Sequence, residues 1–128
     1  MMPRVLVCDD APGVRLLMAS ALEDAGLQAI GPATSWDEAI AMATAERPEA
    51  VLADLWMPTY EPEQLARLCA AVPDGLVFVL SVLPVDQARQ QIAGVGEIAG
   101  VYSKPEPPRH IAVRVRDTLV ASGLATPL

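Results

Sequence analysis

The chain has 128 residues, of which 52% are hydrophobic and 20% charged, so it can form one globular domain with a hydrophobic core and is not a disordered chain. Its 16 acidic residues outnumber its 9 basic ones, and the net charge of −7 argues against direct binding of nucleic acid, which needs clustered lysines and arginines. No apolar stretch approaches the roughly 20 residues that cross a bilayer, and the N-terminus lacks a signal-peptide pattern, so we expect a cytoplasmic protein that is not associated with a membrane.

Five short apolar runs alternate with five stretches of helical periodicity. Strands are predicted at residues 4–8, 27–31, 50–53, 76–80 and 98–102. Between and after them, apolar residues at three- and four-residue spacing predict amphipathic helices, the first with Leu17 on its buried face. Ser35 is expected to cap the second helix and Pro62 to open the third. Because the third and fourth strands are almost wholly apolar, helices should cover both faces of a parallel sheet, which predicts a doubly wound α/β fold.

Side chains with reactive groups follow four of the five predicted strands. They are, in chain order, Asp9 and Asp10 after the first strand, Asp54 after the third, Ser81 after the fourth and Lys104 after the fifth. The carboxyl ends of parallel strands meet at one edge of the sheet, where open α/β sheets bind their ligands. The sequence therefore predicts that three carboxylates, one hydroxyl and the chain's only lysine converge at this edge.

The chemistry of this set points to phosphoryl transfer. Three neighbouring carboxylates repel one another, and a divalent cation relieves the repulsion. Oxygen ligands of this kind favour Mg²⁺. A carboxylate beside bound Mg²⁺ can attack a phosphoryl group and form an acyl phosphate, with catalysis supplied mainly by positioning and charge neutralisation. Mg²⁺, the Lys104 ammonium and the Ser81 hydroxyl could then each take one phosphoryl oxygen.

Four short motifs, in this order, resemble the receiver domain of two-component response regulators. They are CDD at 8–10, DLWMP at 54–58, LS at 80–81 and YSKP at 102–105. The resemblance extends over essentially the whole chain and implies a flavodoxin-like, five-stranded parallel sheet of strand order 2-1-3-4-5 with five helices. It also implies a receiver domain over residues 1–122, followed by a C-terminal tail over 123–128.

The resemblance assigns a phosphoacceptor and a metal site. Asp54 would accept a phosphoryl group from a histidine on a partner kinase or phosphotransfer protein. Mg²⁺ would be held by Asp9, Asp10 and Asp54 together with the backbone carbonyl of Trp56. Such a domain catalyses only its own phosphorylation and dephosphorylation, so we expect a signalling domain rather than an enzyme.

The resemblance also assigns residues that would carry the signal. Lys104 would pair with the phosphoryl group, Ser81 would be the switch hydroxyl and Tyr102 the aromatic switch. Pro105 would follow in a cis peptide, and Pro58 would shape the loop after the phosphoacceptor. Output would pass through the fourth helix, fifth strand and fifth helix to a protein target or an effector domain, and the same face could form a homodimer.

Three positions depart from the family pattern. Pro62 stands where family members usually have glycine, so the loop before the third helix must be built differently. Val82 places a β-branched side chain directly after Ser81, and Trp56 places a large one two residues after Asp54. We hypothesise that Trp56 and Val82 restrict attacking water and prolong the life of phospho-Asp54, although the same crowding could instead impair phosphorylation.

Other interpretations stay open at this stage. The same fold could serve as a degenerate, phosphorylation-independent interaction module, whereas a flavodoxin-like cofactor binder or a haloacid-dehalogenase-like phosphatase would need motifs that are absent here. The chain could be a stand-alone regulator or a receiver cut from a longer protein. Cys8 and Cys69 are expected to be small buried hydrophobes, and His110 an exposed residue in the first turn of the last helix.

Overall fold

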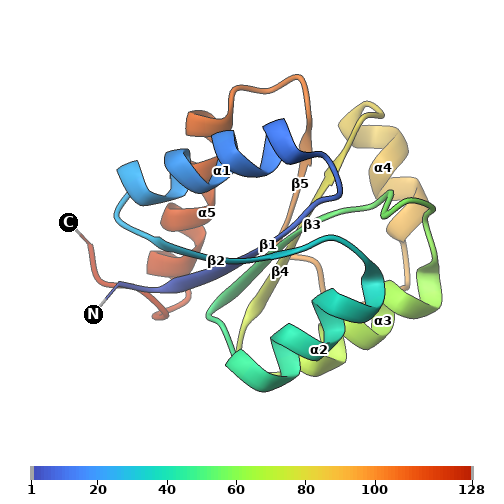
Figure 1. Cartoon of the computed structure of the whole chain (residues 1–128), viewed down its shortest axis with the longest axis horizontal. Helices are drawn as coiled ribbons and strands as arrows, with labels where there is room; N and C mark the ends of the chain where they lie inside the picture. Colours follow the sequence, from blue (N-terminus) through green and yellow to red (C-terminus); the bar gives the residue numbers. More distant parts are fainter. Residues whose placement is uncertain (1, 128) are drawn as a thin grey trace.

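The computed structural model describes residues 2–127, in which five strands alternate with five helices (Figure 1). The strands are β1 (Arg4–Cys8), β2 (Gln28–Ala33), β3 (Ala50–Asp54), β4 (Leu76–Ser81) and β5 (Gly100–Ser103). The helices are α1 (Pro12–Asp24), α2 (Trp36–Glu46), α3 (Pro62–Ala71), α4 (Val85–Ile92) and α5 (Pro108–Ala121). All strands are parallel and lie in the order β2-β1-β3-β4-β5, which confirms the predicted fold class and strand order.

Two hydrophobic cores lie on opposite faces of the sheet, because successive residues of a strand point to opposite sides. Val5 and Val7 of β1 belong to the core shared with α1 and α5. Leu6 and Cys8 belong to the core shared with α2, α3 and α4. Figure 1 shows the two helical layers with the sheet between them. All residues of the central strand β3 are buried, as the apolar run predicts for a strand covered on both faces.

Two helices that begin beside the carboxyl edge of the sheet start where the sequence predicts. Pro62 opens α3, where the missing proline N–H needs no helical partner. At the start of α2, the Ser35 hydroxyl accepts a hydrogen bond from the Glu38 N–H at 3.2 Å. The Glu38 carboxylate in turn accepts a hydrogen bond from the Thr34 N–H at 2.8 Å. The predicted cap at Ser35 and the predicted opening at Pro62 are therefore confirmed.

Three details of the predicted elements are wrong. β5 begins at Gly100 rather than at residue 98. β2 does not end at residue 31 but continues through a cis Gly31–Pro32 bond to Ala33. β2 is an edge strand and can include a proline, because one of its sides has no neighbouring strand. Leu17 is 63% exposed rather than buried. It lies one residue, or about 100° around the helix, from the buried Met18 and therefore at the margin of the apolar stripe.

The minor predictions have mixed outcomes. Cys8 is buried as expected, and burial together with the charge of Asp9 raises the pKa of its thiol. Cys69 is only half-buried, so that prediction is wrong in degree. His110 is exposed in the first turn of α5, as predicted. Within residues 2–127, no helix combines the length and the apolar character needed to cross a membrane.

Candidate functional site

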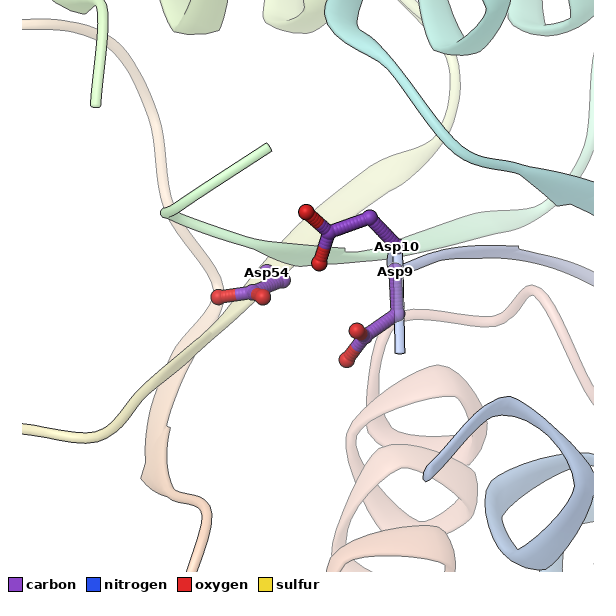
Figure 2. A group of neighbouring side chains, drawn as sticks. All are labelled: Asp9, Asp10 and Asp54. Carbon is purple, nitrogen blue, oxygen red and sulfur yellow. The ribbon is translucent and has the colours of Figure 1, made fainter. Parts of the chain in front are cut away.

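Three of the predicted site residues gather beyond the carboxyl ends of two neighbouring strands. Asp9 and Asp10 directly follow β1, and Asp54 is the last residue of β3. Figure 2 shows the three side chains drawn together at this edge. Each offers one carboxylate oxygen to a group in which all the oxygens lie within 4.8 Å of one another. The structure thus brings the three carboxylates together, as the positions of the strand ends predict.

Asp54 is buried at the end of the central strand, with 2% of its surface exposed. Its Oδ1 accepts a hydrogen bond from the Trp56 N–H at 3.0 Å, and its Oδ2 accepts one from the Lys104 ammonium at 2.9 Å. The hydrogen bond from the Trp56 N–H closes a local turn in which the aspartate side chain binds the backbone two residues further along the chain. Both oxygens of Asp54 are therefore held in defined directions.

Asp9 is buried, whereas Asp10 is exposed. Asp9 Oδ1 accepts a hydrogen bond from the Ala11 N–H at 2.9 Å. Asp9 Oδ2 forms an ion pair with the Lys104 ammonium at 3.1 Å but has no hydrogen-bond partner of good geometry. The Arg15 guanidinium donates to the backbone carbonyl of Asp9 at 3.2 Å. Asp9 is therefore the protein-side carboxylate of the cluster, and Asp10 is the solvent-side one.

Lys104 lies between the two buried carboxylates. Burial, with a smaller contribution from the charge of Asp9, raises the pKa of Asp54 above its ordinary value. The hydrogen bonds that Asp54 accepts from Lys104 and from the Trp56 N–H offset only part of this rise. Burial alone would lower the pKa of Lys104, but the hydrogen bond and charge of Asp54, followed by the ion pair with Asp9, hold it above its ordinary value. Lys104 is therefore an ammonium at neutral pH.

The cluster has the composition of a divalent-metal site. Three negative carboxylates and one positive ammonium leave two negative charges without a counter-charge, which one divalent cation would balance. The buried Asp9 Oδ2 lacks a hydrogen-bond partner, so it has lone pairs available to coordinate a cation. An all-oxygen donor set with carboxylates suits Mg²⁺. The residues present therefore fit the cation that the sequence predicts.

Ser81 ends β4 beside β3 and is fully buried. Its Oγ accepts a hydrogen bond from the Leu83 N–H at 3.1 Å, which leaves the hydroxyl hydrogen available to donate. Its backbone carbonyl accepts a hydrogen bond from the Lys104 N–H at 2.8 Å, which joins the ends of β4 and β5. The next residue, Val82, is 64% exposed. Val82 can therefore restrict the site only from its solvent side.

Residues 5–116 match the family model described as the response regulator receiver domain. The chain belongs to this family. Among curated proteins, a protein-glutamate methylesterase/protein-glutamine glutaminase of Hahella chejuensis is 30% identical to the receiver domain over 109 residues, which cover 83% of this chain and 31% of that relative. The receiver domain spans between 24 and 35% of the length of the four curated relatives that it matches.

Solved structures share the fold of this receiver domain. The chemotaxis response regulator CheY4 of Vibrio cholerae superposes with a TM-score of 0.79 at 24% identity, over 93% of this chain and 100% of that one. A response regulator of Burkholderia pseudomallei, solved with a phosphorylated aspartic acid, a calcium ion and citrate, has a TM-score of 0.76 at 24% identity, over 98% of this chain and 76% of that one.

Tyr102 of the receiver domain lies inside the protein rather than on its surface. Its ring stacks on Phe78 with centroids 6.2 Å apart, and the guanidinium carbon of Arg114 lies 4.7 Å from its centroid. Burial raises the pKa of the Tyr102 hydroxyl, and the charge of Arg114 partly offsets this. A side chain at Gly100 would come within 2.6 Å of the tyrosine oxygen, so the glycine makes room for this inward position.

Pro58 and Pro105 lie in the two loops that flank the carboxylates of the receiver domain. Met57–Pro58 is a cis bond, whereas Lys104–Pro105 is not, so the prediction of a cis bond at Pro105 is wrong. The chain instead turns over residues 103–106, where the Glu106 N–H donates to the Ser103 carbonyl at 2.9 Å. This hydrogen bond closes the turn and leads the chain into α5 without a cis bond.

Sequence reasoning missed two contacts of the loop that follows Asp54. The Tyr60 hydroxyl donates to the backbone carbonyl of Gln91 at 2.9 Å. The Trp36 indole N–H donates to the backbone carbonyl of Thr59, also at 2.9 Å. The only signal in the sequence is the presence of large aromatic residues in and near a polar loop, which predicts packing but does not identify a hydrogen-bond partner.

Proposed function

We propose that this receiver domain accepts a phosphoryl group on Asp54 from a phosphohistidine of a histidine kinase or phosphotransfer protein, in a reaction that requires Mg²⁺. The observation that carries the proposal is the buried Asp54 carboxylate, which lies 2.9 Å from the Lys104 ammonium within a cluster of three carboxylates. An aspartate that only forms a turn needs neither a half-buried lysine nor two acidic neighbours. The phosphorylated aspartic acid in the Burkholderia pseudomallei response regulator, which shares the fold, supports the proposal.

Mg²⁺ would be held by Asp9, Asp10 and Asp54 together with the backbone carbonyl of Trp56. When bound, it would supply positive charge that offsets the repulsion among the carboxylates and between them and the phosphoryl group. The buried oxygen of Asp9 that lacks a hydrogen-bond partner supports this assignment.

The side chains of the protein would carry out the transfer. An oxygen of Asp54 forms a bond to phosphorus while the bond from phosphorus to the imidazole nitrogen of the donor breaks. The departing imidazole keeps the electron pair and takes up a proton. Lys104 binds one oxygen of the phosphoryl group as a cation, and the Ser81 hydroxyl donates a hydrogen bond to another.

The signal would leave through the surface formed by α4, β5 and α5. The new contact of Ser81 and a movement of the buried Tyr102 would shift a two-state equilibrium of this surface. The recipient would be an effector domain, a separate protein or a second copy of the chain. An effector domain is supported by the length of the curated relatives, of which the receiver domain spans between 24 and 35%. The domain itself would catalyse only its own phosphorylation and dephosphorylation, not the reactions that name those relatives.

Incubation of the protein with Mg²⁺ and acetyl phosphate, followed by mass spectrometry, tests the proposal. We expect the mass of one phosphoryl group on the peptide that contains Asp54, and no added mass when EDTA is present. Absence of an adduct at saturating acetyl phosphate would overturn the proposal and would favour a phosphorylation-independent interaction module of the same fold.

Trp56 and Val82 are expected to prolong the lifetime of phospho-Asp54. Trp56 is half-buried with its ring 6.3 Å from that of Tyr60, and Val82 is exposed beside Ser81. Trp56→Asn and Val82→Ala should each admit water more readily and accelerate hydrolysis, on the order of tenfold for Trp56 and less for the exposed Val82. Release of inorganic phosphate from the phosphorylated variants measures the rate, and wild-type rates in both variants would contradict the expectation.

A further inference from the structure

The loop that follows Asp54 is attached to α4 by a long-range hydrogen bond. The Tyr60 hydroxyl donates to the backbone carbonyl of Gln91 at 2.9 Å, across 31 positions of the chain. Gln91 is the next-to-last residue of α4. The last carbonyls of a helix have no partner within the helix. Tyr60 therefore satisfies a backbone group at the C-terminal end of α4.

The same loop is linked to the phosphoacceptor at its other end. The Trp56 N–H donates to Asp54 Oδ1 at 3.0 Å. The Trp56 ring packs against the Tyr60 ring with centroids 6.3 Å apart and planes tilted by 58°, and the stability of such a pair depends on its geometry. A continuous series of contacts therefore runs from the Asp54 carboxylate through Trp56 and Tyr60 to α4.

The two helices that the loop contacts differ in their packing neighbours: α2 packs against α3, β1 and β2, whereas α4 packs mainly against β5. The loop is bound to α2 through Thr59, whose carbonyl accepts the indole N–H of the buried Trp36. The Ser35 side chain caps α2, whereas no side chain caps the N-terminus of α4. A displacement of the loop would therefore move α4 more readily than α2.

Several polar atoms around Tyr60 are buried without hydrogen-bond partners. They are the indole N–H of Trp56 and the side-chain carbonyl oxygens of Gln64 and Gln91. Gln64 lines the same surface hollow as Tyr60, and Gln91 accepts the Tyr60 hydroxyl. A buried polar group without a partner costs free energy, so a rearrangement that paired any of these atoms would recover it. The junction between the loop and α4 therefore contains polar atoms that can form new hydrogen bonds if the loop moves.

We propose that Tyr60 is a positioning residue through which the phosphoacceptor loop controls the position of α4. Loading of Asp54 changes the carboxylate contact of the Trp56 N–H, shifts the aromatic pair and alters the hydrogen bond from Tyr60 to α4. This route is distinct from the one through Ser81 and Tyr102. The inference rests on the proposed function, because it requires that Asp54 be loaded.

Tyr60→Phe tests the inference, because it keeps the ring that packs on Trp56 and removes only the hydroxyl. Amide hydrogen exchange over residues 85–95 is measured by mass spectrometry, with and without Mg²⁺ and beryllofluoride, a phosphoryl analogue. Without the analogue, we expect exchange in this segment to be about fivefold faster in Tyr60→Phe than in the wild type, the effect of losing one net hydrogen bond. With the analogue, exchange in this segment should change in the wild type and change clearly less in the variant.

Thr44→Val is the matched control, because the Thr44 hydroxyl also donates to a backbone carbonyl, that of Ile40, but within α2. Binding of beryllofluoride is followed separately by fluorine NMR. If it binds both proteins and changes α4 exchange equally, the role of Tyr60 is overturned while the proposed function stands. If it does not bind the wild type, the proposed function fails and this inference with it. Equal acceleration of α4 exchange in Thr44→Val would also overturn the role of Tyr60, because it would indicate a general loss of stability.

Discussion

The Asp54→Asn variant is expected to carry no phosphoryl adduct after incubation with Mg²⁺ and acetyl phosphate, under conditions that modify the wild type. An amide has no anionic oxygen with which to attack phosphorus. The variant should still fold, because Lys104 keeps its ion pair with Asp9 at 3.1 Å. Intact-mass spectrometry measures the adduct. Asp74→Asn, which changes an exposed carboxylate outside the cluster, should be modified as the wild type is. An undiminished adduct on Asp54→Asn would show that another group accepts the phosphoryl group.

The same substitution tests the electrostatics of the site. Burial raises the pKa of Asp54 in the folded protein above its unfolded value, so the ionised carboxylate destabilises the fold at neutral pH. This cost disappears as the pH falls through the raised pKa, because the folded protein then binds the proton. Asp54→Asn should therefore be more stable than the wild type at neutral pH, and the difference should shrink on acidification. Urea denaturation at neutral and mildly acidic pH measures it, and a difference that grew on acidification would contradict the sign.

The Asp9→Asn variant is expected to bind Mg²⁺ at least about tenfold more weakly than the wild type. Substitution of residues that only hold the ligands of a metal site already lowers metal affinity about 10- to 100-fold, and Asp9 would be a ligand itself. Asp9 is buried and has an oxygen without a hydrogen-bond partner, and asparagine would offer a neutral oxygen there. Isothermal titration with MgCl₂ measures the affinity. Asp24→Asn, which changes an exposed acid at the end of α1, should retain wild-type affinity. Unchanged affinity in Asp9→Asn would exclude Asp9 from the metal site.

The architecture could be predicted from the sequence because buried apolar residues recur at the regular spacing of strands and helices. The apolar runs of β3 and β4 and the apolar spacing of the helices indicate which faces are covered. The gathering of Asp9, Asp10 and Asp54 could be predicted because parallel strands all end at the same edge, whatever the details of their packing. These predictions depend on topology, which tolerates errors of one or two residues at the ends of elements.

The predictions that failed depend on finer detail. The exposure of Leu17 depends on where the covering stripe of α1 ends, a difference of one residue around the helix. The isomer of the Lys104–Pro105 bond, which is not cis, leaves no periodic pattern in the sequence. The contact of Tyr60 with Gln91 joins positions 31 apart, and nothing in the local sequence of either residue identifies the other.

Asp54 ends the middle strand of the five, all of whose residues are buried, whereas α4 buries only two side chains. Amides at the centre of a sheet exchange with solvent only when most of the protein opens, while thinly packed elements open at a much lower free-energy cost. We therefore expect the carboxylate that would receive the phosphoryl group to lie in a slow-opening part of the domain, and α4 to open more readily. A modest change in free energy at the site can then shift α4 while the strand that carries the carboxylate stays closed.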